Sequence, residues 1–80
     1  MVNHGTVESL LTATRAALVV RMEMEADHRF YARRAAEEAA RAERAITQAA
    51  RERHEELAKQ FASRARDAEM ALQALAAEHC

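Results

Sequence analysis

The 80-residue sequence contains no proline and a single glycine, Gly5. Proline and glycine are the residues that most strongly interrupt helices, so no residue after position 5 forces a helix to end. Alanine, the best helix former, occupies 21 of the 80 positions. The sequence therefore predicts an all-α fold built from long helices.

Cysteine and long apolar runs are also scarce. Cys80 is the only cysteine, so one chain cannot form an internal disulfide, which is typical of proteins in the reducing cytosol. The most apolar run, residues 10–20, contains Arg15 and is too short to span a bilayer. We expect a cytoplasmic protein without a membrane span.

Neither sign of charge dominates, because 12 basic residues stand against 13 acidic ones. This balance argues against electrostatic binding to nucleic acid, and three aromatic residues are too few for a base-stacking platform. The sequence shows no nucleophile with a placed base and no glycine-rich loop for phosphate. We expect no nucleic-acid partner, no cofactor and no enzymatic activity.

Apolar residues recur at steps of three and four, the spacing of one helix face. We expect residues 1–5 to form a flexible lead, Thr6 to cap the first helix, and residues 6–80 to form one domain. Two seams should supply its core. The expected core residues are Val20, Met24, Tyr31, Ala35, Ala39, Ala42, Ile46, Leu57, Phe61, Ala65, Ala68, Leu72 and Leu75.

Between the two seams, Thr47 can cap a new helix. A turn near Thr47-Gln48 predicts an antiparallel hairpin of two long helices in which small residues lie opposite large ones. The expected pairs are Ala35 with Phe61, Ala39 with Leu57, and Met24 with Leu72. One continuous helix of about 70 residues is the alternative, because no residue here compels a turn.

A chain this short buries little surface, and alanine contributes little to that burial. In the hairpin, residues 6–15 extend beyond the end of the second helix and carry large apolar side chains that need a contact. The expected partner interface comprises Val7, Leu10, Leu11, Leu18 and Met22. We expect a homodimer that completes a four-helix bundle, or docking on another helical protein.

A rival interpretation starts from Glu25 and His28, which have the Glu-x-x-His spacing of di-iron helical bundles. Glu69 is the third candidate ligand, and a ferritin-like metal-binding dimer would use all three. The motif occurs once, so we predict no metal site and interpret His28 as an edge residue beside Met24 and Tyr31. A second rival is a small regulator that folds on a partner protein.

Residues 30–61 carry an aromatic pair, an Arg-Ala step and a later His-x-x-Leu-Ala-x-x-aromatic step. These are Phe30-Tyr31, Arg34-Ala35, and His54, Leu57-Ala58 and Phe61. The pattern resembles a group of small, uncharacterised bacterial helical-hairpin proteins rich in alanine. The resemblance implies a turn near Thr47-Gln48 and implies no activity.

Overall fold

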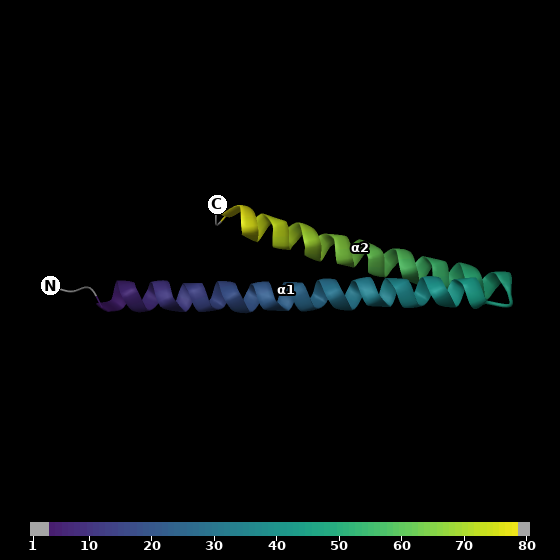
Figure 1. Cartoon of the computed structure of the whole chain (residues 1–80), viewed down its shortest axis with the longest axis horizontal. Coiled ribbons are helices and arrows are strands. Elements are labelled where there is room, and N and C mark those ends of the chain that lie inside the picture. Colours follow the sequence, from purple (N-terminus) through teal and green to yellow (C-terminus); the bar gives the residue numbers. More distant parts are fainter. Residues whose placement is uncertain (1–3, 79–80) are drawn as a thin grey trace.

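The computed structural model describes the backbone of residues 4–78 and the side chains of residues 12–77. Two helices, α1 (His4–Arg44) and α2 (Gln48–Glu78), pack against each other in an antiparallel hairpin (Figure 1). The described part of the chain contains no strand. The all-α hairpin is therefore confirmed, and the continuous helix is wrong.

The hairpin is a thin rod, with extents of 73 × 18 × 13 Å. α1 begins at His4, two residues before the expected cap at Thr6, and it continues beyond the end of α2 (Figure 1). The side chains of Val7, Leu10 and Leu11 lie outside the described residues. The backbone nevertheless shows the predicted N-terminal extension of α1.

The link between the helices comprises residues 45–47, and Thr47 caps α2 as the sequence predicts. The Ala50 backbone N–H donates a hydrogen bond to the Thr47 hydroxyl oxygen at 3.1 Å, which satisfies a donor that the first turn of a helix leaves unpaired. At the other side of the link, the Ala45 N–H donates to the Ala42 carbonyl at 3.2 Å. The turn thus forms without glycine or proline.

The turn is centred on Ile46, slightly earlier in the chain than expected, and the pairing of the helices shifts with it. Phe61 stacks on Tyr31, with ring centroids 6.3 Å apart, where the expected partner was Ala35. Ile46 itself is 100% exposed, so its assignment to the core is wrong. The physical reason is that Ile46 lies at the tip of the link, beyond both helices.

The core is narrow and consists mainly of small side chains. Ala42 and Ala65 are buried. The other expected core residues that are half-buried are Met24, Tyr31, Ala35, Leu57, Phe61, Ala68, Leu72 and Leu75. Val20 and Ala39 are exposed, which corrects the predicted seam at two further positions.

The rings of Phe30, Tyr31 and Phe61, which are all the aromatic residues of the chain, gather at one level of the hairpin. Phe30 meets Tyr31 edge-on, with centroids 5.4 Å apart. The guanidinium of Arg34 lies 5.1 Å from the Phe61 ring centroid, and that of Arg64 lies 5.7 Å from the Tyr31 centroid. At this level, large aromatic side chains and their cation–π contacts supply packing that the small alanine side chains cannot supply elsewhere along the seam.

The capping bond at the turn yields a stability prediction. Thr47→Ala removes the acceptor for the Ala50 N–H and should lower the free energy of unfolding by about 1 kcal/mol. Thr47→Ser, which keeps a hydroxyl, is the matched control and should lose much less. Urea titration followed by circular dichroism measures both, and equal stability of the three proteins would contradict the capping role.

Candidate functional site

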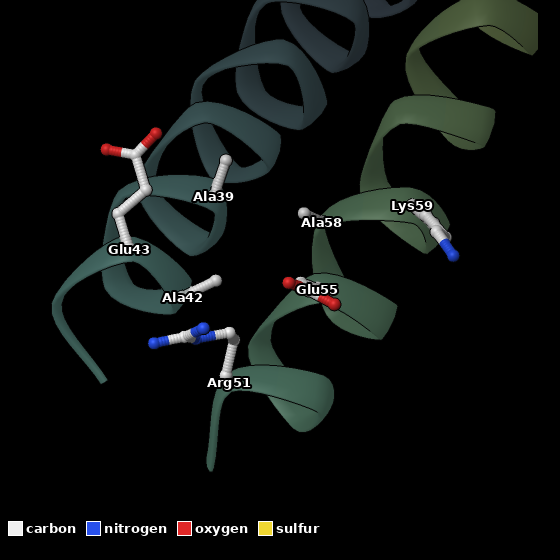
Figure 2. Close-up of a pocket in the computed structure, with 7 residues that line it drawn as sticks. All are labelled: Ala39, Ala42, Glu43, Arg51, Glu55, Ala58 and Lys59. Atoms are coloured by element: carbon white, nitrogen blue, oxygen red, sulfur yellow. The ribbon is translucent and has the colours of Figure 1, made fainter. Parts of the chain in front are cut away.

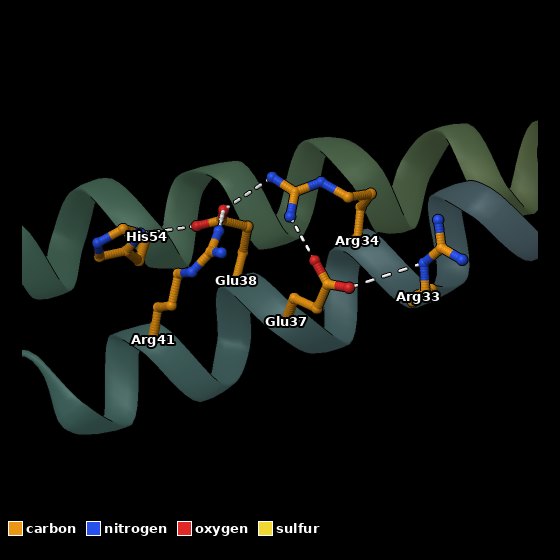
Figure 3. Close-up of polar contacts among 6 residues, drawn as sticks. All are labelled: Arg33, Arg34, Glu37, Glu38, Arg41 and His54. Carbon is orange, nitrogen blue, oxygen red and sulfur yellow. Dashed lines mark hydrogen bonds and ion pairs between the residues drawn. The ribbon is translucent and has the colours of Figure 1, made fainter.

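The most buried side chain described in the structure is a carboxylate, that of Glu38, with 2% of the residue exposed. Figure 3 shows Glu38 on α1 reaching His54 on α2. The His54 Nδ1 lies 2.6 Å from Glu38 Oε2 and donates to it. Glu38 Oε1 accepts bonds from Arg34 at 3.0 Å and Arg41 at 2.6 Å. The carboxylate therefore joins the two helices while both of its oxygens are satisfied.

The surroundings of Glu38 favour its ionised form. The hydrogen bond from His54 lowers the pKa of the Glu38 carboxyl most strongly; desolvation opposes this, and the hydrogen bond from Arg41 acts in the same direction as His54. Glu37, on the same helix, accepts from Arg34 and pairs with Arg33 at 3.7 Å, which completes the chain of charges seen in Figure 3. Its hydrogen bond also raises the pKa of Arg34.

Sequence reasoning missed this cluster because the predicted core follows Ala35, Ala39 and Ala42 along α1 and leaves Glu38 out. The sequence did contain a signal. From Tyr31, strict alternation of steps of four and three selects Ala35, Glu38, Ala42 and Ala45. These positions are buried or half-buried, whereas Ala39, on the predicted seam, is exposed.

Beside the seam, near the turn, residues of both helices line an open groove of about 590 Å³ (Figure 2). Alanines form its walls, and charged side chains stand at its rims. The lining residues are Ala39, Ala42, Glu43, Arg51, Glu55, Ala58 and Lys59. Such a groove offers apolar contact and close approach to a neighbouring chain, with acidic and basic groups at its margin.

Large apolar side chains are exposed on α1 toward its N-terminal half. Leu18 is 54% exposed and Met22 is 65% exposed, and Val19 beside them is also exposed. A small cavity of about 100 Å³ lies next to them where Leu75 of α2 approaches Ala17 and Leu18. These exposed positions include the two members of the predicted partner interface whose side chains the structure describes.

The three candidate metal ligands do not meet in the hairpin. Glu25 pairs with Arg21 at 3.4 Å, and His28 is half-buried on the seam. Among the residues that the structure describes, no three His, Cys, Asp or Glu side chains gather closely enough to hold a metal ion, so Glu25, His28 and Glu69 are not brought together within one chain.

Comparison with known proteins found no matching family model, no matching curated protein and no matching solved structure. Neither helix, over the residues described, has an apolar stretch sufficient to cross a membrane.

The Glu38 cluster predicts unequal effects at two neighbouring glutamates. Glu38→Ala removes the shared acceptor of Arg34, Arg41 and His54 and should lower the melting temperature by several degrees. Glu37→Ala, the matched control, removes contacts within α1 only and should change it little. Thermal unfolding followed by circular dichroism compares the two, and a larger loss for Glu37→Ala would refute the interhelical role.

The lowered pKa of Glu38 also predicts how stability depends on pH. The folded state holds this carboxyl ionised at pH values where the unfolded chain protonates it. The contact therefore stabilises the hairpin above the ordinary pKa of 4.5, and this contribution is lost as the pH falls below 4.5 toward the lowered value. Glu38→Gln should flatten this part of the stability profile measured by urea titration. An unchanged profile would show that other carboxyls produce the acid sensitivity.

Proposed function

We propose that this chain is a non-enzymatic helical interaction module that self-associates, or docks on another helical protein, through the N-terminal face of α1. We define that face by the expected interface residues Val7, Leu10, Leu11, Leu18 and Met22. The exposure of Leu18 and Met22 carries the proposal. Large apolar side chains clustered on a protein of this size mark a contact surface.

The length of α1 supports the same proposal. α1 has 41 residues and α2 has 31, and α2 does not accompany the N-terminal end of α1 (Figure 1). A partner that lies along this end would accompany the part of α1 that has no neighbouring helix in the hairpin (Figure 1). The Leu72 and Leu75 end of α2 belongs to the proposed contact, since both leucines are half-buried and Leu75 lines a small cavity together with Leu18.

The chemistry of the remaining sites supports a binding role over a catalytic one. The polar atoms of Glu38 are occupied by Arg34, Arg41 and His54, so this carboxylate serves to join helices. The groove near the turn is open and has alanine walls. It is too open to enclose a small molecule as ligand pockets do, although charged side chains stand at its rims.

The interaction proposal predicts different behaviour for two similarly exposed methionines. Met22→Glu places a charge in the proposed contact face and should shift the mass measured by light scattering from dimer toward monomer, with helicity retained. Met70→Glu is the matched control, since Met70 is 66% exposed on α2 and lies outside that face. It should leave the mass unchanged.

The two rival functions give different results with the wild-type protein. Stoichiometric iron or zinc after purification, with melting that shifts in chelator, would favour the ferritin-like dimer. Loss of the helical signal on dilution to low micromolar concentration would favour a regulator that folds on its partner. A monomer at every concentration, with no loss of helicity, would contradict self-association.

A further inference from the structure

The charges of the hairpin are divided between its two halves. Residues 28–66, the half next to the turn, carry ten basic and six acidic side chains, a net charge of +4. Residues 4–27 and 67–78, the open half, carry two basic and seven acidic side chains, a net charge of −5. The near-neutral total of −1 therefore conceals a molecule with a positive end and a negative end.

This division distinguishes the ways in which two copies can pack. A parallel pair brings like halves together, and end-to-end pairing through the open halves brings two negative ends together. In an antiparallel, side-by-side pair, the positive half of each copy lies along the negative half of the other. A two-fold axis relates these two contacts. Charge complementarity of this kind sets orientation more than it sets affinity.

One face of α1 suits the antiparallel arrangement. Leu18 and Met22, in the open half, share this face with Ala32 and Ala36, in the turn half. Leu18 and Ala32, like Met22 and Ala36, are 14 residues apart, which is close to four whole helical turns. All four residues are exposed. Successive residues of a helix are about 100° apart, and each residue of this face follows a position of the seam that α2 covers. The face therefore lies about 100° around α1 from that seam. A second helix pair can therefore pack there as in a four-helix bundle.

The register of the pair is set at the middle of that face by Glu25 and Arg29. Within the described part of the chain, no carboxylate lies within ion-pair distance of Arg29, while Glu25 is half-buried and pairs only with Arg21 of its own helix, at 3.4 Å. A two-fold axis midway between them brings Glu25 of each copy level with Arg29 of the other. At that register Met22 is level with Ala32, and Leu18 with Ala36. Large side chains then meet small ones on both sides of the axis.

We propose that the partner on this face is a second copy of the chain, packed antiparallel along α1 with reciprocal contacts between Glu25 and Arg29. This inference rests on the proposed self-association and specifies its geometry. The N-terminal apolar side chains of each copy then cover the alanine-rich turn half of the other. The pair is isologous, so it closes as a dimer and leaves no equivalent face unfilled.

Charge reversal at the axis tests the reciprocal contact. Glu25→Arg and Arg29→Glu each turn two attractive contacts into repulsive ones and should weaken dimerisation on the order of tenfold. Glu23→Arg is the matched control for Glu25→Arg: it makes the same charge change two residues away, on the other side of α1, and should have a much smaller effect. The double variant should dimerise like the wild type, and circular dichroism verifies folding. A double variant as weak as either single variant would overturn the register.

Orientation is tested with a spin label at Ile46, which is fully exposed at the turn. The protein is Ile46→Cys in a Cys80→Ser background, and pulsed dipolar spectroscopy measures the distance between the two labels of a dimer. The proposed register places residue 46 of the two copies about 57 Å apart, at a rise of 1.5 Å per residue. A parallel dimer would give less than about 25 Å, given interaxial distances near 10 Å.

The outcomes separate the orientation from the self-association on which it rests. Dimer mass by light scattering together with the long distance supports the inference. Dimer mass with a short distance, or with no dipolar signal because the copies join only at their ends, overturns the antiparallel geometry and leaves self-association standing. Monomer mass at all concentrations overturns both.

Discussion

The closed hairpin depends on a carboxylate placed where a helical seam usually holds an apolar side chain. Glu38 lies between Ala35 and Ala42 on the face of α1 that meets α2, and it is the most buried residue described. Burial of an unpaired carboxylate would oppose folding. The two arginines pair with the carboxylate within α1, and His54 on α2 adds the hydrogen bond that forms only when the helices are together. The neighbouring alanines let the helices approach closely enough for this bond to form.

The residues that join the two helices differ from those that form the outer surface of the hairpin. The Glu38 cluster joins the helices by the hydrogen bond between His54 and Glu38, and the stacked rings of Tyr31 and Phe61 add a second contact about two turns away. Elsewhere along the seam, alanines and exposed apolar side chains give little burial. Charges that balance over the whole chain separate into a positive and a negative half. Stability within one chain and the proposed recognition between chains thus draw on different residues.

The sequence predicts the architecture well because helix formation is a local property. The absence of proline and the alanine content predict long helices, and the Thr47 cap favours a turn between them without compelling it. Register is not local, since it depends on which residue occupies the tip of the link. Because Ile46 occupies that tip, the helices pair in a different register from the predicted one. Glu38, rather than Ala39, therefore lies against α2. A rule that places only apolar residues in the core cannot select a buried glutamate. Glu38 could have been found only by following strictly alternating steps of three and four residues along α1 and by recognising His54 as its partner on α2.

The small size of Ala42 has a consequence for how this sequence can change. Ala42 is buried one helical turn from Glu38, between the carboxylate and the link. A bulkier side chain there would wedge the helices apart and draw His54 out of hydrogen-bonding reach, although neither polar residue had been altered. Substitutions at the alanine and at the polar pair should therefore be strongly non-additive. We therefore expect the hairpin to tolerate substitutions on its outer surfaces far better than between Glu38 and Ala42. There, a substitution must preserve both the close approach of the helices and the hydrogen bond to His54.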